Sequence, residues 1–212
     1  MTFRKTAAII LTIILSANIS PLAYSQENRT STHSIKYSYS SNPHDIIIKT
    51  DGISISGRFY TIKEFESLLN KAVLIADIGG NQTRVAIAAG IYFIPGIGEI
   101  AIAATGAIVV AGATVAVGSW LYKTITNWLN DSAKQEIARV KGAIPSRLRN
   151  SDGNVDLSKF KDKVKGKNAY REKGGWTIDK DTAGHGGRKW KLKNKNGNRI
   201  ASLGSNGEVL GK

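Results

Sequence analysis

The sequence of 212 residues contains no cysteine and only three histidines. Without cysteine, the chain can form no disulfide framework, no thiolate zinc site and no cysteine nucleophile. The sequence also lacks HxH and HExxH motifs and has no cluster of carboxylates. We therefore expect no metal site and no cofactor.

Acidic residues are also scarce, since 16 Asp and Glu stand against 30 Lys and Arg and the formal net charge is +14. A charge of this size predicts an acidic polymer as the partner, such as nucleic acid, anionic lipid or anionic wall material. The charge is uneven: from Lys141 to Lys212 there are 18 Lys and Arg against 7 Asp and Glu. This localised charge is typical of a nucleic-acid binder that follows the phosphate backbone; the alternative is a solvated basic face with no polyanion partner.

The first 25 residues have the pattern of a secretory signal peptide. Arg4 and Lys5 precede an apolar run at 7–17, and small residues precede the expected cleavage after Ser25. The alternative is an uncleaved anchor helix, although the run is shorter than the ~20 residues that a membrane span needs. We expect residues 1–25 to be removed and the protein to be secreted, with membrane or cell-surface association through its later apolar segment.

The next two segments are expected to be a linker and a small folded unit. Residues 26–44 are rich in Ser, Thr and Asn and predict a disordered linker. Residues 45–84 predict a ββα unit, in which Asp51–Gly52 forms the hairpin turn and a helix follows. Thr61 and Glu64 have the spacing of a capping box at the start of that helix.

An apolar segment at 85–123 follows, and Glu99 is the only charged residue between Val85 and Tyr122. The uncharged part from Ile100 is long enough, at ~1.5 Å per residue, to cross a hydrocarbon core of ~30 Å. Because proline and glycine interrupt helices, residues 95–98 predict the turn of a helical hairpin that contacts a membrane. The alternative is a buried hairpin of a soluble protein. Three glycines at intervals of six residues are expected to let a partner helix approach closely: Gly106, Gly112 and Gly118.

Residues 124–150 predict a polar linker helix, and the turn-forming sequence NSDGN then predicts a domain boundary near residue 150. The basic module at 151–212 is expected to contain one helix, with apolar residues at helical spacing from Leu157 to Val164. Three or four antiparallel strands should follow, separated by two Asn-Gly turns. The complete chain is thus predicted to be α+β. The apolar face of this sheet is expected to comprise Trp176, Ile178, Trp190, Leu192, Ile200, Leu203 and Val209.

A secretion signal, a Gly/Ala-rich middle and a compact basic tail together resemble bacterial polymorphic toxins. The tail segment GGWTIDKDTAGHGGRKWKLKNKNGNRIASLGSNGEVLGK resembles the C-terminal modules of contact-dependent and secreted antibacterial toxins. The middle segment YFIPGIGEIAIAATGAIVVAGATVAVGSWLY is similar to the apolar segment of Bacillus-type secreted toxins. A helix with an antiparallel sheet is similar to the barnase/EndoU/colicin/RelE group of ribonucleases, which is an analogy at the level of the fold. The resemblance implies endoribonuclease activity, with transfer RNA as the expected substrate, and a cognate immunity protein.

Cleavage of RNA by its 2′-hydroxyl needs a base, an acid and cations around the transition state. His185 in the loop AGHGG is the candidate proton-transfer residue, with Asp179 or Asp181 to orient it; the alternative is an ordinary exposed loop histidine. The candidate catalytic residues are His185, Arg188, Lys191, Asp179, Thr182 and Ser202. The candidate RNA-binding residues are Lys189, Lys193, Lys195, Arg199 and Lys173.

These observations predict a secreted antibacterial toxin with a metal-independent endoribonuclease at its C-terminus. Its expected partners are RNA, an immunity protein and a membrane contacted through Val85–Tyr122. The first alternative is a membrane-active, pore-forming protein with a basic surface-binding tail. The second alternative is a nonenzymatic protein that binds the cell wall or surface.

Overall fold

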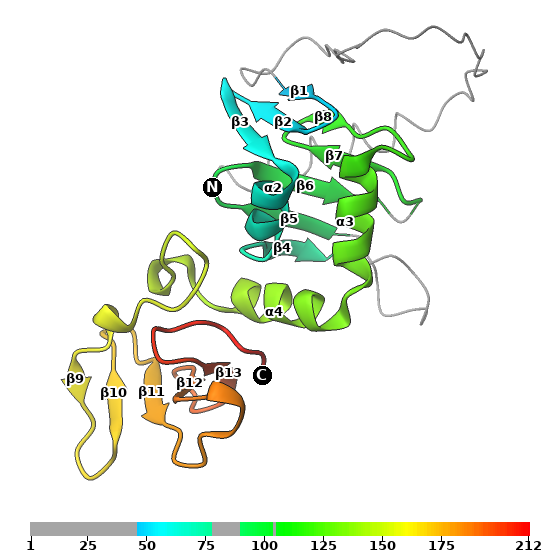
Figure 1. Cartoon of the computed structure of the whole chain (residues 1–212). Coiled ribbons are helices and arrows are strands. Elements are labelled where there is room, and N and C mark those ends of the chain that lie inside the picture. Colours follow the sequence, from blue (N-terminus) through cyan, green and yellow to red (C-terminus); the bar gives the residue numbers. More distant parts are fainter. Residues whose placement is uncertain (1–45, 78–89, 104) are drawn as a thin grey trace, which may run out of the picture. The chain divides into compact units, whose positions relative to one another are not determined.

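The computed structural model describes residues 46–77, 90–103 and 105–212, and these residues form two compact units (Figure 1). The C-terminal unit contains Asn70–Leu74 and Trp128–Lys212, and the N-terminal unit contains the other described residues. The described residues include α-helices and antiparallel sheets, which confirms the predicted α+β class. The predicted signal peptide at 1–25 and linker at 26–44 lie outside the described residues, as do parts of the predicted ββα unit and hairpin.

A three-stranded antiparallel sheet and a helix form the first part of the N-terminal unit. The second β-branched run of the sequence forms two strands, because the chain turns at Ser56 and Gly57, both of which have positive φ. The predicted ββα arrangement therefore gains a strand. These elements are β1 (Ile46–Ile48), β2 (Gly52–Ile55), β3 (Arg58–Thr61) and α2 (Ile62–Leu69).

The predicted capping box starts α2. The Glu64 amide donates to Thr61 Oγ1 at 3.3 Å, and the Thr61 amide donates to Glu64 Oε2 at 2.8 Å. Two amide groups at the helix end thus have partners, which confirms the prediction. The helix ends at Leu69, and the apolar residues that follow form strand β4 (Val73–Asp77).

The predicted helical hairpin at 85–123 is wrong, because the described part of this segment contains four strands and is helical only from Trp120 onward. Ile94 pairs with Gly98 across a tight turn, so the chain reverses at the predicted residues 95–98 but does so as a β-hairpin. Many of the apolar residues are Ile or Val, which favour strands, and Gly96 and Gly98 take positive φ that a helix cannot use. With β4, these strands form a sheet in the order β4-β5-β6-β7-β8. Their bounds are β5 (Gly90–Ile94), β6 (Gly98–Ile102), β7 (Ile108–Val110) and β8 (Ala113–Thr114).

The three regularly spaced glycines also have a different role from the one predicted. Gly106, Gly112 and Gly118 lie in turns and bends outside the strands and not on a helix that could pack against a partner. Among the described residues, no helix has the length and apolar character that a membrane span requires.

Two helices connect the sheets of the chain: α3 (Trp120–Asn130) and α4 (Ser132–Ala143). Asp131 caps α4, since one of its carboxylate oxygens accepts hydrogen bonds from the amides of Ala133 and Lys134, both at 3.1 Å. The polar sequence of α4 predicted a linker, but Val140 of this helix belongs to the core of the C-terminal unit. Apart from Asn70–Leu74, the unit therefore extends from Trp128 and includes α4, whereas the sequence predicted a boundary near residue 150.

The C-terminal unit contains a five-stranded antiparallel sheet in the order β13-β12-β11-β10-β9 (Figure 1). The helix predicted from Leu157 is a single 3-10 turn, η2 (Leu157–Lys159). Asp156 caps this turn by accepting the Ser158 amide at 3.0 Å, and the chain then enters the first strand. The strands are β9 (Asp162–Lys163), β10 (Ala169–Arg171), β11 (Thr177–Lys180), β12 (Trp190–Lys193) and β13 (Arg199–Leu203).

The apolar face of this sheet has the composition predicted from the sequence. Ile178, Leu192 and Leu203 are buried in the core of the unit, with Val209 from the last turn of the chain. Trp176, Trp190 and Ile200 are partly buried and pack against the same core. The two tryptophans therefore contribute to the packing of this core.

Both Asn-Gly pairs form turns, as predicted. In the first turn, Asn194 Oδ1 accepts hydrogen bonds from the amides of Asn196 at 3.0 Å and Asn198 at 2.9 Å. In the second turn, a Cβ atom on Gly207 would lie 2.0 Å from the carbonyl oxygen of Val155. Only glycine permits this close approach, which anchors the end of the chain to the core.

Candidate nucleic-acid interface

The face of the C-terminal sheet that is opposite the core has a central row of polar residues. Asp179 of β11 pairs in register with Lys191 of β12, and Lys191 pairs with Ser202 of β13. Directly paired residues of antiparallel strands point to the same face, so three predicted site residues lie side by side.

Two ion pairs hold the lysines of this face. Lys193 Nζ contacts the carboxylate of Asp179, and Lys191 Nζ lies 3.1 Å from Asp181 Oδ1. The Asp181 side chain is only 5% exposed, and its carboxylate also accepts the Ala183 amide at 3.1 Å. The hydrogen bond from Lys191 is the main cause that lowers the pKa of Asp181 below its usual value. Both aspartates that were predicted to orient His185 are therefore bound to lysines.

His185 lies in the connection between β11 and β12, in the 3-10 turn η3 (His185–Gly187), and is exposed. Gly184 and Gly186 on either side have left-handed backbone conformations, which set the shape of this turn. Within the described part of the chain, no carboxylate forms an ion pair with the imidazole of His185. Thr182 is exposed in the same connection and Arg188 is half-buried. The structure thus places three candidate catalytic residues in one loop.

Ser202 is fully buried and cannot meet a substrate in this structure. Its hydroxyl is contacted by Arg199 Nη2, and its amide donates to the carbonyl oxygen of Gly211 at 2.7 Å. The last residues of the chain therefore run beside β13. The observed role of Ser202 is to hold Arg199, which differs from the predicted catalytic role.

The predicted RNA-binding residues do not form a single cluster. Lys173 and Lys195 lie in the β10–β11 and β12–β13 connections, which are at the same end of an antiparallel sheet. A Cβ atom on Gly175 would lie 3.4 Å from Lys195 Cβ, so these two turns are in contact. His185 is in the β11–β12 connection at the other end, about 13 Å away along a four-residue strand.

A buried carboxylate that sequence reasoning missed fixes one of these turns. Glu172 binds the guanidinium of Arg147 through both carboxylate oxygens, and it accepts the amides of Gly174 at 2.8 Å and Trp176 at 3.0 Å. The hydrogen bond from Arg147 is the main cause that lowers the pKa of Glu172 to about 2. The following Gly174–Gly175 pair was the available signal, because it indicates a turn whose backbone amides need acceptors.

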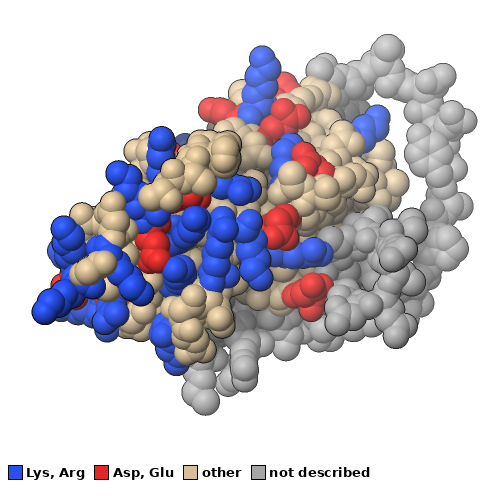
Figure 2. All heavy atoms as spheres, turned by 90° about the horizontal axis from the view of Figure 1, so that it is seen from below, with Lys and Arg blue, Asp and Glu red and all other residues tan. Residues whose placement is uncertain are grey.

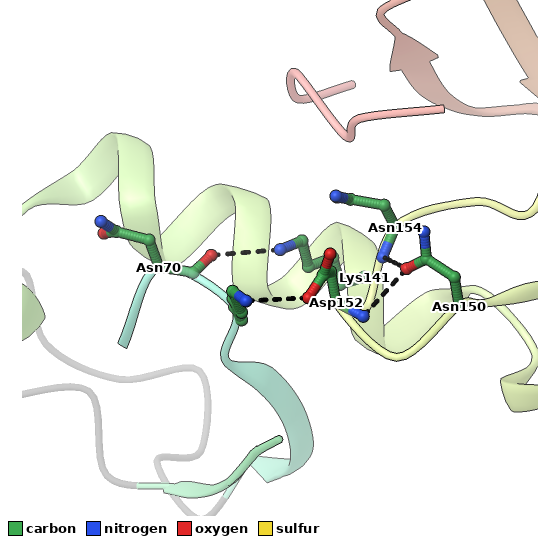
Figure 3. Close-up of polar contacts among 6 residues, drawn as sticks. Asn70, Lys141, Asn150, Asp152 and Asn154 are labelled. Carbon is green, nitrogen blue, oxygen red and sulfur yellow. Dashed lines mark hydrogen bonds and ion pairs between the residues drawn. The ribbon is translucent and has the colours of Figure 1, made fainter. Parts of the chain in front are cut away.

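A second buried charge lies on α4. Lys141 is 4% exposed and donates from Nζ to the carbonyl oxygen of Asn70 at 3.1 Å (Figure 3). Burial lowers its pKa to about 8, although the nearby carboxylate of Asp152 acts in the opposite direction. Asp152 itself is paired with Lys71 at 2.8 Å. These contacts attach the segment Asn70–Leu74 to the rest of the C-terminal unit.

Exposed cations surround this sheet. Figure 2 shows Lys and Arg side chains gathered at the left of the view, the side on which β9 and β10 lie in Figure 1. The exposed cations of the C-terminal unit from β9 onward include Lys163, Lys165, Lys167, Arg171, Lys173, Lys180, Lys189 and Lys195. Within the described ranges, no three His, Cys, Asp or Glu side chains come together as ligands for a metal ion.

Comparison of the chain with known protein families, curated proteins and solved structures finds no match. The resemblance to polymorphic toxins and to the barnase/EndoU/colicin/RelE group therefore stays a prediction.

Proposed function

We propose that the C-terminal unit binds and cleaves RNA, and that the chain is a secreted antibacterial toxin. The single observation that supports the RNA-binding part most strongly is the exposed positive charge of this unit. Its carboxylates are largely engaged, since Glu172 binds Arg147, Asp179 binds Lys193 and Asp181 binds Lys191. A surface with exposed cations and neutralised acids suits a phosphate backbone.

The reaction that fits these residues is transfer of the phosphodiester to the neighbouring 2′-hydroxyl. The 2′-oxygen forms a bond to phosphorus, the bond to the 5′-oxygen breaks, and a cyclic phosphate and a 5′-hydroxyl result. A base removes the proton of the 2′-hydroxyl and an acid protonates the departing oxygen. His185 is proposed for one of these transfers because it is exposed and an imidazole can both accept and donate a proton.

Cations stabilise the charge that develops on phosphate in this reaction. Arg188 follows His185 by three residues in the same connection, and its guanidinium can contact two phosphate oxygens at once. Lys189 comes next and is exposed. The role predicted for Asp179 and Asp181 changes: each positions a lysine on the sheet instead of orienting the histidine.

The test is single-turnover cleavage of total transfer RNA by the full chain. We expect His185→Ala to lower the rate by on the order of 10²–10⁴-fold with RNA binding nearly unchanged. Ser205→Ala is the matched control, since Ser205 is exposed in the turn after β13, at the same end of the sheet. A His185→Ala protein that cleaves at the parent rate would remove this residue from the mechanism. Loss of cleavage in chelator would contradict the metal-independent scheme.

A second candidate is nonenzymatic binding to a polyanion of the cell wall or surface. The observation that favours it is that Asp179 and Asp181, the two carboxylates predicted to orient His185, are bound to lysines instead. This candidate predicts salt-dependent RNA binding with no cleavage by the parent protein. The pore-forming alternative depended on a helical hairpin at 85–123, and we do not propose it because the described residues between Gly90 and Thr114 form strands and turns.

A further inference from the structure

The β9–β10 hairpin and the residues on either side of it carry exposed cations, and the predicted site included only one of them, Lys173. We define the lysine hairpin as residues Lys161–Lys173. It contains two acidic residues, of which Glu172 is bound to Arg147 and only Asp162 is exposed. Its six exposed cations are Lys161, Lys163, Lys165, Lys167, Arg171 and Lys173.

We propose that the lysine hairpin binds the phosphate backbone of double-helical RNA next to the loop that contains His185. This inference rests on the proposed function and adds to it a binding surface and the kind of RNA that it fits.

The cations of the hairpin can bind phosphate without breaking an internal ion pair. The ion pairs of the described residues involve Lys191 and Lys193 of β12 but none of the six cations of the hairpin. A phosphate that binds Lys191 must compete with the buried carboxylate of Asp181, whereas a phosphate at Lys165 has no such competitor. A polyanion is therefore expected to bind first at the hairpin.

The position of the hairpin connects it to the candidate catalytic loop. The Lys180 amide donates to the carbonyl oxygen of Asn168 at 2.9 Å, so the turn of the lysine hairpin lies beside the end of β11. The connection with His185 starts one residue later, at Asp181. Since β9 is an edge strand, no further strand of this sheet covers the outer side of the hairpin. An RNA strand whose phosphates bind Lys165 and Lys167 can therefore extend to His185, which lies at the same end of the sheet.

The aromatic residues of the unit argue against recognition of single strands. The unit has five Phe, Tyr and Trp side chains, of which Trp128 and Phe160 are buried and Tyr170, Trp176 and Trp190 are half-buried. Proteins that bind single strands stack bases on exposed aromatic rings. Double-helical RNA is instead recognised by its shape and through its phosphates and 2′-hydroxyls, which lysines can contact.

A lipid surface fits the hairpin less well. Val164 and Tyr170 are the apolar residues of the lysine hairpin with the largest side chains, and both are half-buried and not displayed as a continuous apolar strip. Stable binding to a membrane surface normally combines basic residues with inserted apolar side chains. We therefore favour the RNA duplex over an anionic membrane.

The experiment measures binding of the full chain to a short RNA duplex with methylated 2′-oxygens, which cannot be cleaved through its 2′-hydroxyl. The same strand in single-stranded form and vesicles that contain phosphatidylserine are the other two probes. The hairpin variant is Lys163→Gln, Lys165→Gln and Lys167→Gln together. The control variant is Lys49→Gln, Lys63→Gln and Lys123→Gln, which removes the same charge from exposed lysines of the N-terminal unit.

We expect the parent to bind the duplex more tightly than the single strand. The hairpin variant should bind the duplex at least about tenfold more weakly, and its log-log salt slope should fall by up to about 2.7, or ~0.9 for each phosphate that a lysine no longer neutralises. The control variant should change the slope by much less, because its lysines lie outside the proposed surface.

Equal effects of the two variants would show that only net charge matters and would overturn the proposal. Tighter binding of the single strand would also overturn it, as would a hairpin variant that loses vesicle binding but keeps duplex binding. Absence of ribonuclease activity would contradict the proposed function and leave this result unaffected, because the probe is not cleaved.

Discussion

The two units of the chain differ in what their cores contain. In the described part of the N-terminal unit, the buried side chains that define the core are apolar, among them Phe65, Ile102 and Ile125. Within the described residues, the buried polar and charged side chains lie in the C-terminal unit: Gln135, Lys141, Glu172, Asp181 and Ser202. Apolar packing is insensitive to pH, whereas buried ionisable groups link folding to protonation. The unit that we propose as the RNA binder should therefore be the one whose stability depends on pH.

The largest expected effect concerns the N-terminal unit. Val115 is 3% exposed, so Val115→Lys places an unpaired charge in an apolar core and should lower the free energy of unfolding by about 3–5 kcal/mol. Hydrogen exchange of the full chain, followed separately for the two units, measures this effect. The loss of protection should be confined to the N-terminal unit.

Val117→Lys is the matched control, since Val117 lies two residues further on and is 80% exposed. It should change the free energy of unfolding by less than about 0.5 kcal/mol. If both substitutions had the same small effect, the strands observed in this segment would be in doubt.

The next effect is an increase in stability of the C-terminal unit at alkaline pH. Burial lowers the pKa of Lys141 to about 8, below its value in the unfolded chain. The free-energy penalty for burying the charged Lys141 ammonium is largest below pH 8 and declines as the pH rises towards 10.5. The free energy of unfolding should therefore increase over this range by on the order of 2–3 kcal/mol. Denaturant unfolding at a series of pH values measures the increase.

Lys141→Met should remove that increase, and Lys134→Met, on an exposed lysine of the same helix, should preserve it. A parent protein with no rise between about pH 8 and 10 would show that solvent reaches the Lys141 ammonium and would contradict its burial.

A smaller effect is expected at acidic pH. The Arg147 guanidinium is the main cause that holds the pKa of Glu172 near 2, below the unfolded value, so the stabilisation is present above about pH 4.5 and is lost as the pH falls towards 2. Because the Arg147 side chain is 51% exposed, we expect a loss on the order of only 1–2 kcal/mol. Thermal unfolding between about pH 5 and 2 measures it.

Glu172→Gln should make the C-terminal unit less sensitive to pH over this range. Glu66→Gln, on an exposed glutamate of α2, should leave the acid dependence of the C-terminal unit unchanged. If the parent and Glu172→Gln lost the same stability between about pH 5 and 2, Glu172 would not be the cause of the acid dependence.

The smallest effect tests the local structure of the N-terminal unit. Thr61→Ala removes one half of the capping box and should destabilise the unit by about 1 kcal/mol, with no dependence on pH between about 6 and 10. Denaturant unfolding checks the size, and Ser67→Ala on an exposed residue of α2 is the control. An effect confined to the C-terminal unit would contradict the division into two units.

Local sequence signals predicted the parts of the fold that depend on local contacts. The pair Thr61 and Glu64 and the turn at Asn196–Gly197 are examples, because a few neighbouring atoms determine each of them. The apolar segment at 85–123 was predicted incorrectly because a run of Ile, Val, Ala and Gly is apolar on every face. Neither the helical nor the strand period is visible in such a run, and burial on both faces of a sheet produces the same pattern.

The candidate site was predictable only in its composition. The lysines of β12 and the exposed loop at His185 follow from alternation and from glycine, but the partners of Asp179 and Asp181 depend on the register of three strands. Likewise, α4 has a polar sequence, and its buried Lys141 is explained only by the backbone carbonyl of Asn70, which lies 71 residues earlier in the chain. Contacts at this separation leave no periodic signal in the sequence.

The attachment of Asn70–Leu74 to the C-terminal unit also has a consequence for biosynthesis. During translation, segment Asn70–Leu74 leaves the ribosome before α4, the helix with Lys141 that it contacts. The 71 residues between Asn70 and Lys141 take about 4–14 s to synthesise at about 5–20 residues per second. The C-terminal unit thus cannot finish folding from its contiguous residues alone. Proteolysis near residue 127 would leave Asn70–Leu74 on one fragment and Lys141 on the other, so Lys141 would lose its carbonyl partner.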